Sequence, residues 1–416
     1  MTSKILKLEE CLYFFFIFLI SNQLGKHFWF NFSYVQGLRI DYLSPTFYLT
    51  DLIILSLFFI QIFKINFKVA NIKIKDNLWI MVWLFVLFSG IALSISPLLG
   101  IYKILKIFEF SFLGFYFVQQ FSKKKLFKKT ILVISISVIL QSILAISQFL
   151  KQGSIGGLFY YFGERTFNGQ TPGIANASIN GELVLRPYGT FSHPNLLAGF
   201  LVVTIILIFS QLLIAKENKI RLFYVSSVFI GTIALAFSMS RAAVFAYVLT
   251  LGALFVKKRI SYLIIPLAIS VVFFGIFNGR FLKFDLKEVA VIERLELLKV
   301  SWIMFLKNPF IGVGLNNFLS NIPYFISSKN LILQPVHNIY MLILAETGFL
   351  GISFFAVFII KTINRIIKDK SVYKKSKLII FIIILFLGMF DHYLLTLQQG
   401  QILLTLSLGF IFAKQE

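Results

Sequence analysis

The chain has 416 residues, of which 58% are hydrophobic, with 51 phenylalanines and a mean hydropathy of +0.87. Soluble globular proteins are only about 45–50% apolar, so the composition excludes a soluble protein and predicts a single integral membrane domain over residues 1–416. The net charge of +23 does not predict nucleic-acid binding, because the Lys and Arg residues cluster between apolar runs, as in cytoplasmic connections of membrane proteins.

The apolar runs predict the fold class of an all-α polytopic membrane protein with about twelve transmembrane helices. We expect these helices near residues 9–25, 45–63, 77–96, 99–120, 130–150, 194–215, 222–240, 242–256, 260–277, 337–360, 378–391 and 400–413. The N-terminal run has no small-residue cleavage site and therefore predicts a retained first helix. The single cysteine, Cys11, lies in this run and offers neither a disulfide framework nor a cysteine-based metal site.

Every second connection between the expected helices is basic, which predicts that both termini are cytoplasmic. The basic connections are residues 64–75, 123–129, 216–221, 257–259 and 361–377. The other side then receives two large extracytoplasmic loops, residues 151–193 and 278–336. It also receives short connections near 26–44, 97–98, 239–241 and 391–400.

The second large loop contains apolar residues at helical spacing between Asp285 and Lys307, followed by Asn308 and Pro309, which end the pattern. The spaced residues are Val291, Leu295, Leu298, Trp302 and Phe305. This pattern predicts an amphipathic helix that could lie at the membrane interface. No internal repeat is recognisable, which argues against a transporter built from two inverted halves.

Three arginines are candidates for binding an anion. Arg241 stands between two apolar runs on the side where cations are disfavoured, so it either faces a partner, a substrate or water, or extends from a helix end to the membrane surface. Arg186 lies in a turn just before an expected helix and should reach the mouth of the membrane domain. Arg294 either points inward from the amphipathic helix or pairs with Glu293 or Glu296.

Other polar residues have both a structural and a functional interpretation. Residues 192–195 resemble a helix cap with Ser192 as the capping residue, although His193 and Asn195 stand beside Arg186. His337 opens an expected helix and can carry a proton near neutral pH. Glu346, nine residues later, is either functional or paired to an arginine for packing.

Two further polar groups are expected to be structural. Lys103, Lys106 and Glu109 stand at helical spacing and are expected to pair with one another. Near the C-terminus, the sequence FDHYLLTLQQGQ could bind sugar hydroxyls, but we favour a tight polar hairpin. Its polar residues are Asp391, His392, Gln398 and Gln399.

Four stretches together resemble the signature of the O-antigen ligase superfamily, which includes O-antigen polymerases and bacterial protein O-oligosaccharyltransferases. They are RPYGTFSHPNLLAGFL from Arg186, SMSRAA from Ser238, ERLELLKVSWIMFLKNPFIGVGLNNF from Glu293 and HNIYMLILAETGFLG from His337. The motif region spans residues 180–355, and their order and separation also fit the superfamily.

The resemblance implies a glycosyltransferase of the C-type architecture in the bacterial cytoplasmic (inner) membrane, acting in polysaccharide or lipopolysaccharide biosynthesis for the cell envelope. Its donor would be an undecaprenyl diphosphate-linked glycan and its acceptor a lipid or glycan hydroxyl on the extracytoplasmic face. His337 matches the general base, and Arg186, Arg241 and Arg294 are expected to hold the diphosphate. Supporting roles are expected for His193, Asn195, Asn338 and Glu346.

No D-x-D element occurs in an expected outer loop, so we expect neither a metal nor a cofactor. Attack opposite the leaving diphosphate would invert the anomeric carbon. The sequence leaves open whether the protein is a ligase or a polymerase. A glycolipid transporter or flippase is a weaker alternative, because such proteins typically have charged residues and broken helices near the middle of the membrane.

Overall fold

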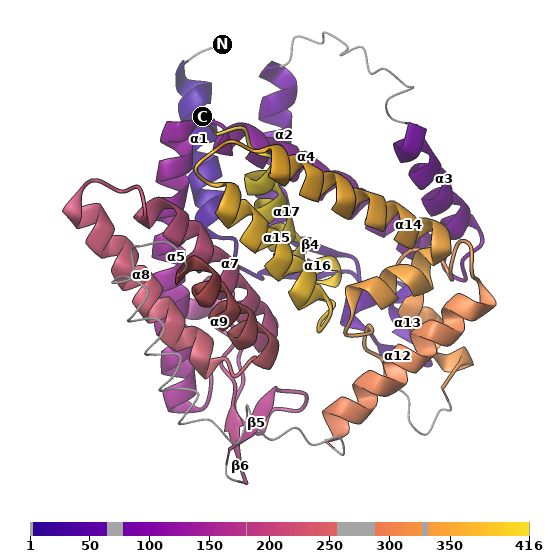
Figure 1. Ribbon diagram of the computed structural model, residues 1–416. Coiled ribbons are helices and arrows are strands. Elements are labelled where there is room, and N and C mark those ends of the chain that lie inside the picture. The colour runs from indigo at the N-terminus through magenta and orange to yellow at the C-terminus, as the bar shows by residue number, and fades with distance from the viewer. Residues whose placement is uncertain (1–2, 65–77, 180, 256–287, 327–331, 416) are drawn as a thin grey trace.

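The structure is a computed structural model that describes residues 3–64, 78–179, 181–255, 288–326 and 332–415. The expected helix at 260–277, the basic cluster at 257–259 and the first part of the second large loop lie outside the described residues. Within the described ranges the chain is mostly helical (Figure 1).

The longer helices follow the apolar runs. In chain order they are α1 (Ser3–Phe18), α2 (Leu49–Lys64), α3 (Leu78–Ala92), α4 (Pro97–Phe121), α5 (Lys124–Lys151), α7 (Pro194–Leu212), α8 (Asn218–Phe237), α9 (Arg241–Phe255), α12 (Val289–Lys307), α14 (Ile339–Lys368), α15 (Lys374–Gly388) and α17 (Gln398–Phe412). Three helices of a single turn lie in the connections: α6 (Leu158–Tyr161), α13 (Phe318–Asn321) and α16 (Tyr393–Thr396).

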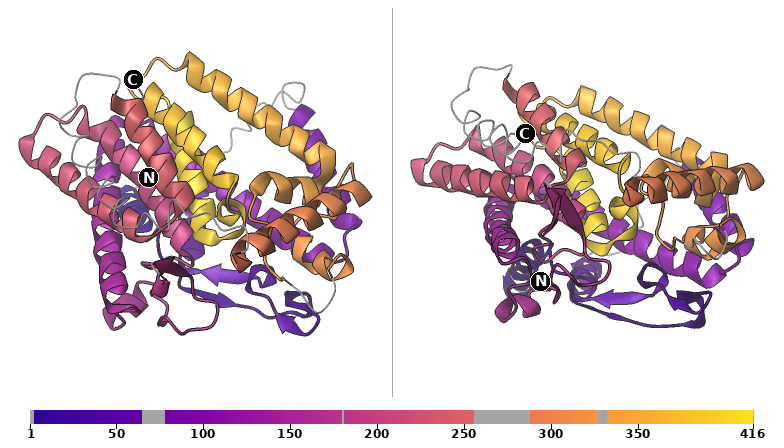
Figure 2. Two further views of the ribbon diagram at one scale, coloured as in Figure 1. Left: turned by 60° about the horizontal axis from the view of Figure 1, so that its bottom comes forward. Right: turned by 90° about the horizontal axis from the view of Figure 1, so that it is seen from below.

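Short antiparallel strand pairs also occur in the connections. Strand β1 (Gly25–His27) pairs with β4 (Thr46–Tyr48), β2 (Tyr34–Val35) with β3 (Leu38–Arg39), and β5 (Asn176–Ile179) with β6 (Glu182–Leu185). Figure 2 shows the segment that carries β1 to β4 along one flank of the helix bundle.

Four of the described helices, α5, α7, α8 and α14, are long and apolar enough to cross a membrane, and two shorter apolar helices lie at Met81–Ala92 and Arg241–Gly252. These helices indicate a polytopic membrane protein. Each expected helix within the described residues has an observed counterpart, although the boundaries differ by several residues. The count of twelve spans stays a prediction.

Helix α7 is the centre of the main core. Its sequence, PNLLAGFLVVTIILIFSQL, carries no charge and is apolar on every face, which is typical of a helix surrounded by protein. Nearly every residue of α7 is buried, and its neighbours are α5, α8, α9, α15 and α17. This helix therefore provides a rigid support for the residues at its N-terminus.

A second core cluster lies between α12, α13 and the start of α14. Helix α12 is the expected amphipathic helix, but the face that it buries consists of Leu297, Val300, Ser301 and Met304. Two residues of the expected apolar stripe, Leu295 and Trp302, are exposed instead. The reason is that α12 has apolar residues on two faces. The face that packs against α14 is the one with Leu297, Val300 and Met304, and not the face predicted from the spacing.

Helix α14 is interrupted at Gly348, which the sequence analysis did not predict. Gly348 has φ 63° and ψ −163°, outside the helical region and accessible mainly to glycine. Residues 309–314 run beside the interruption: the backbone N–H of Val313 donates to Ala345 O (2.9 Å), and that of Phe349 donates to Pro309 O (2.7 Å). The broken helix therefore keeps backbone hydrogen bonds, because another segment supplies them.

Both termini lie at one end of the bundle, and the β5–β6 hairpin projects from the opposite end (Figure 1). Several basic residues of the connections bind the terminal segments. Lys64 pairs with Glu9, Lys129 with Glu10 at 2.6 Å, and Lys377 Nζ donates to Ala413 O at 2.7 Å. These three lysines thus lie near the terminal segments of the chain.

Candidate active site

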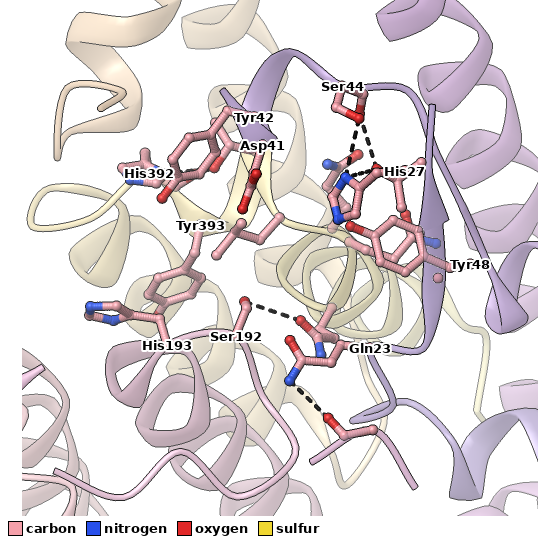
Figure 3. A pocket seen from close by; sticks show the side chains of 18 of the residues that line it. Gln23, His27, Asp41, Tyr42, Ser44, Tyr48, Ser192, His193, His392 and Tyr393 are labelled. Atoms are coloured by element: carbon pink, nitrogen blue, oxygen red, sulfur yellow. Dashed lines mark hydrogen bonds between the residues drawn. The ribbon is translucent and has the colours of Figure 1, made fainter. Parts of the chain in front are cut away.

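A polar cavity of about 550 Å³ lies among the connections of the bundle (Figure 3). Its lining comes from four parts of the chain, residues 23–48, 160–193, 316–337 and 391–401, and from the first turns of α4. Aromatic rings such as Tyr42 and Tyr48 alternate with amide and hydroxyl groups on its wall. Such a lining suits a polar ligand with apolar faces.

His337 and Asp391 come together at this cavity. The Nδ1 atom of His337 lies 3.5 Å from Oδ1 of Asp391, and its Nε2 atom lies 3.4 Å from Oε1 of Gln334, another lining residue. His337 immediately precedes α14, whereas Asp391 follows α15, so the pair joins two adjacent helices. With the carboxylate beside Nδ1, Nε2 is the ring nitrogen that can exchange a proton with a ligand.

The Asp391 carboxylate is held in place from two sides. The backbone N–H of His392 donates to Oδ1 (2.8 Å), and Nδ2 of Asn195 donates to Oδ2 (2.8 Å). Burial favours the neutral acid, but the neighbouring His337, His392 and His193 outweigh it, so the pKa of Asp391 lies well below its ordinary value. Asp391 is therefore a carboxylate throughout the neutral pH range.

Asn195 connects Asp391 to Arg186. Nη2 of Arg186 donates to Oδ1 of Asn195 (2.6 Å), and Nε of Arg186 donates to the carbonyl of Ser238 (2.8 Å). Ser238 lies three residues before Arg241, which begins α9. Arg186, Asn195 and the start of α9 are thereby gathered behind the Asp391 carboxylate.

His193, and not Ser192, caps helix α7. The side chain of His193 accepts a hydrogen bond from the backbone N–H of Asn195 (3.1 Å), whereas Ser192 donates to Oε1 of Gln399 (3.3 Å). The expectation for Ser192 was wrong because Pro194 occupies the first helical position and leaves the cap to the residue before it.

The pKa of His193 is lowered to about 3. Burial is the main cause; Asp391 acts in the opposite direction, and the positive charges of Arg186, His337 and Arg294 add to the lowering. His193 is therefore neutral at physiological pH, as its role as a hydrogen-bond acceptor requires.

His392 stands beside His337 with ring centroids 5.0 Å apart, and the ring of Tyr42 meets it edge-on at 5.4 Å. Its Nδ1 atom lies 2.6 Å from Oγ1 of Thr396. Burial lowers the pKa of His392 to about 3 against the opposing effect of Asp391. Figure 3 shows His392 and Tyr42 together on the wall of the cavity.

The three candidate arginines are not among the residues that line the cavity. Arg186 is buried, and Arg241 and Arg294 are partly buried. The positive charge of Arg294 contributes to lowering the pKa of both His193 and His392, so this residue of α12 lies within electrostatic range of the site. Arg165 of the first large loop does line the cavity, although the sequence analysis did not select it.

Asn338 and Glu346 have structural partners. Asn338 caps α14 by accepting from the backbone N–H groups of Tyr340 and Met341, and it donates to Met389 O (3.1 Å). It thus fixes His337 relative to the turn that carries Asp391. Glu346 lies away from the cavity lining, where it accepts from the backbone N–H of Phe318 (3.4 Å) and interacts electrostatically with Lys103.

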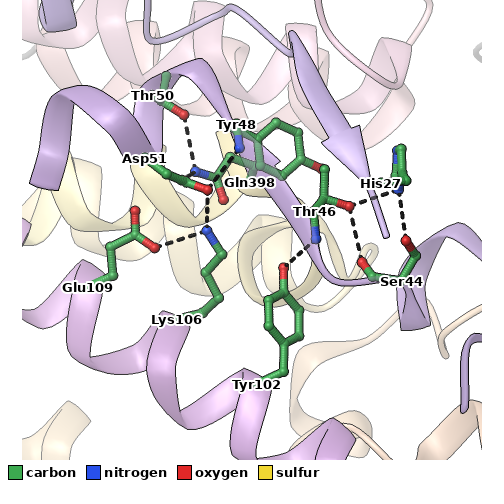
Figure 4. Close-up of polar contacts among 10 residues, drawn as sticks. All are labelled: His27, Ser44, Thr46, Tyr48, Thr50, Asp51, Tyr102, Lys106, Glu109 and Gln398. Atoms are coloured by element: carbon green, nitrogen blue, oxygen red, sulfur yellow. Dashed lines mark hydrogen bonds and ion pairs between the residues drawn. The ribbon is translucent and has the colours of Figure 1, made fainter. Parts of the chain in front are cut away.

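A second polar group includes Lys106 and Gln398, which also line the cavity (Figure 4). Lys106 pairs with Glu109 at 2.9 Å, as expected, and also with Asp51 of α2 at 2.7 Å, which was not expected. Gln398 donates to Asp51 as well. Lys103 was expected to join Lys106 and Glu109, but its Nζ atom donates to the carbonyl of Leu395.

Asp391, the most direct partner of His337, was not predicted as such from the sequence. A polar hairpin was favoured over sugar binding for Asp391 and His392, because Asp391 lies 54 positions after His337 and no periodicity links the two residues. A signal was nonetheless present: an Asp-His pair at the outer end of an apolar run is an expensive placement unless it has a function.

Fold and site together define a polytopic membrane protein with a histidine–aspartate pair at a polar cavity. Residues 226–356 match the family model described as O-Antigen ligase. This part of the chain is therefore similar to the O-antigen ligase family, which is a family of glycosyltransferase-type enzymes that use lipid-linked glycans. The matched range includes Arg241, Arg294 and His337, whereas Arg186 and Asp391 lie outside it. A search of curated proteins found no match.

Proposed function

We propose that this protein transfers a glycan from an undecaprenyl diphosphate carrier to an acceptor hydroxyl on the extracytoplasmic face of the bacterial cytoplasmic membrane. The observation that carries the proposal is the His337–Asp391 pair at the polar cavity, with His337 inside the matched O-antigen ligase range. In this reaction His337 is the general base and Asp391 orients it.

At the anomeric carbon, the chemical step forms one bond and breaks one. The acceptor oxygen attacks the anomeric carbon while its proton moves to Nε2 of His337, and the bond between the anomeric carbon and the diphosphate oxygen breaks. The diphosphate leaves with the electron pair. Asp391 holds the Nδ1 side of the ring and stabilises the imidazolium that forms, and the 3.5 Å separation would shorten as the ring gains charge. Attack from the face opposite the diphosphate inverts the anomeric carbon.

The leaving diphosphate requires positive charge, and arginine suits it because guanidinium groups bind phosphate oxygens in pairs. Arg186, Arg241 and Arg294 are the proposed cradle. Three observations support it: Arg186 donates to Asn195, the charge of Arg294 acts on His193, and Arg241 begins α9 three residues after Ser238, whose carbonyl accepts from Arg186. Fixed guanidinium groups can stabilise the developing charge without a metal, and we propose a metal-independent reaction.

The proposed sidedness rests on the distribution of charge and of cavity-lining residues. Most of the lining comes from segments that the alternation of basic connections assigns to the extracytoplasmic side. Lys64, Lys129 and Lys377 instead bind segments near the two termini, which we propose to be cytoplasmic. With about twelve spans, this arrangement corresponds to the C-type glycosyltransferase architecture.

A ligase and a polymerase would differ only in the acceptor, and both fit the cavity. The transporter alternative gains one observation, the interruption of α14 at Gly348, since broken helices are common at transport sites. However, residues 309–314 fill the interruption with backbone, and the polar cavity lies elsewhere. We therefore favour the enzyme.

The test is an assay of the purified protein in detergent with an undecaprenyl diphosphate-linked glycan, candidate acceptors and EDTA. We expect release of undecaprenyl diphosphate that depends on the acceptor, and the acceptor that reacts identifies ligase or polymerase. His337→Ala should lower turnover by roughly 10²–10⁴-fold, the usual contribution of a general base. Arg241→Ala should lower it by roughly 100-fold or more.

Both variants should remain folded and membrane-inserted, which thermal unfolding in detergent would verify. Normal turnover in either variant would remove its assigned role. No release with any acceptor, together with glycolipid movement across proteoliposomes, would instead support the transporter.

A further inference from the structure

Three potential ligand atoms converge beside the cavity. One ring nitrogen each of His337 and His392 and one carboxylate oxygen of Asp391 lie within 4.8 Å of one another. Oδ1 of Asp391 is 3.5 Å from Nδ1 of His337 and 3.9 Å from Nε2 of His392. The Nδ1 atom of His337 is buried and, among the described residues, has only the 3.5 Å approach to Asp391 in place of a well-formed hydrogen bond, so it points into this group.

The contacts of His392 decide which of its nitrogens can meet a metal ion. Its Nδ1 atom is occupied by the Thr396 hydroxyl, 2.6 Å away. Its Nε2 atom lies 3.9 Å from Oδ1 of Asp391, which is beyond hydrogen-bond distance. Nε2 is therefore the nitrogen of His392 that can share a cation with the Asp391 carboxylate.

We propose that His337, Asp391 and His392 bind a divalent transition-metal ion, typified by Zn²⁺, and that the bound ion switches the enzyme off. The inhibitory part rests on the proposed function, whereas the binding part does not. Zn²⁺ binds imidazole and carboxylate at roughly 2.0–2.2 Å with tetrahedral geometry, which separates neighbouring ligand atoms by about 3.4 Å. The 3.5 and 3.9 Å separations from Oδ1 are close to this spacing, and the two nitrogens lie within 4.8 Å of each other, so the ligands would draw together by up to about 1.4 Å on binding.

Inhibition follows from the tautomer that the metal selects. A neutral imidazole that binds a metal through Nδ1 carries its proton on Nε2. That atom is the one that must accept the proton from the acceptor hydroxyl in the proposed reaction. Metal binding thus moves the His337 proton from Nδ1, through solvent, to Nε2 and removes the general base without blocking the cavity.

Two imidazoles and one carboxylate also define the type of ion. This ligand set suits Zn²⁺, Co²⁺, Ni²⁺ and Cu²⁺, whereas Mg²⁺ and Ca²⁺ prefer oxygen ligands throughout. The site therefore distinguishes transition metals from the divalent ions that accompany many phosphate-transferring enzymes.

The binding test uses the full-length protein in detergent, stripped of metal and titrated with Co²⁺. We expect visible absorption bands of four-coordinate Co²⁺ at one ion per chain, displaced by Zn²⁺ and unaffected by excess Mg²⁺. His392→Asn should weaken Co²⁺ binding at least roughly tenfold, the loss that even outer-shell changes cause. Asn is chosen because its amide can keep the bond to Thr396 while lacking an atom at the Nε2 position.

His27→Asn is the matched control. His27 lines the same cavity, but its Nδ1 atom bonds Ser44 and Thr46, away from the three ligands. This variant should bind Co²⁺ as the unaltered protein does. A Co²⁺ spectrum without four-coordinate bands, or bands that survive in a folded His392→Asn variant, would overturn the proposal. If that variant does not fold, the spectrum of the unaltered protein decides alone.

The activity test separates this inference from the proposed function. Glycan transfer should stop when Zn²⁺ is added and return with EDTA, and His392→Asn should resist Zn²⁺ relative to its own metal-free rate. Transfer that is insensitive to saturating Zn²⁺ would refute the inhibition while leaving the glycosyltransferase intact. Co²⁺ binding without any glycan transfer would refute the proposed function and leave the metal site standing.

Discussion

Replacing Asp391 by Asn removes one negative charge next to His337 while keeping the size of the side chain. The two groups are 3.5 Å apart, so at an effective dielectric constant of about 20 a full imidazolium is attracted by roughly 5 kcal/mol. If the proton is about half transferred in the transition state, the loss is about 2–3 kcal/mol. This corresponds to a roughly 30- to 150-fold decrease in kcat.

The hydrogen bonds around Asp391 add to this loss. Its two oxygens accept separately from the N–H of His392 and from Nδ2 of Asn195. An Asn side chain has one oxygen and one NH₂ group. If its oxygen accepts from one of these donors, its NH₂ group faces the other donor and cannot accept from it. The substitution therefore also disturbs the position of the His337 partner.

The assay is the rate of undecaprenyl diphosphate release at saturating donor and acceptor, with KM determined in parallel. We expect kcat to fall while KM changes little, because the charge acts in the transition state and not on the bound substrate. Glu182→Gln, which removes an exposed carboxylate from β6, is the control and should keep normal kcat. A folded Asp391→Asn variant with kcat within about threefold of normal would refute the pairing, since that change is only about 0.6 kcal/mol.

Two further predictions concern stability. Gly348→Ala should destabilise the protein by about 2 kcal/mol or more, because Gly348 has a positive φ and a Cβ would overlap the backbone of Phe310. Gly252→Ala is the control: Gly252 lies in open space on α9, so this change should be neutral or slightly stabilising. Equal midpoints of thermal unfolding for the two variants in detergent would contradict the prediction. His193 has a folded-state pKa of about 3, below its unfolded value, so it contributes stability above pH 6.5 that is lost at about 1.4 kcal/mol per pH unit as the pH falls toward 3. Unfolding measured against pH should show a shallower slope in His193→Asn, and an unchanged slope would count against a neutral buried His193.

Hydropathy predicted the positions of the helices well, because an apolar run long enough to cross a membrane is a local property of the sequence and does not depend on long-range contacts. Hydropathy did not predict the break in α14, because the residues around Gly348 are as apolar as those of a continuous helix. What breaks the helix is the backbone of residues 309–314, which arrives from a distant part of the sequence. No local propensity contains that information.

The site was predicted in part. Motifs brought out His337 and Asn195, whose positions are fixed by nearby helix starts, and the structure places both beside Asp391. Asp391 itself is recognisable only from a contact between separate helices. The same holds for Asp51, which binds Lys106 across two helices whereas the sequence suggested only the local pair with Glu109.

The contact between residues 309–314 and α14 also bears on how this sequence can change over generations. A side chain on Gly312 would collide with the backbone at Glu346, and one on Gly348 with the backbone at Phe310. Because each glycine lacks a Cβ, the backbone of the opposite segment can pack directly against it. Replacing either glycine by a larger residue would force the two segments apart. We expect related proteins to keep or lose both glycines together, and the two motifs that contain them to be inherited as one unit.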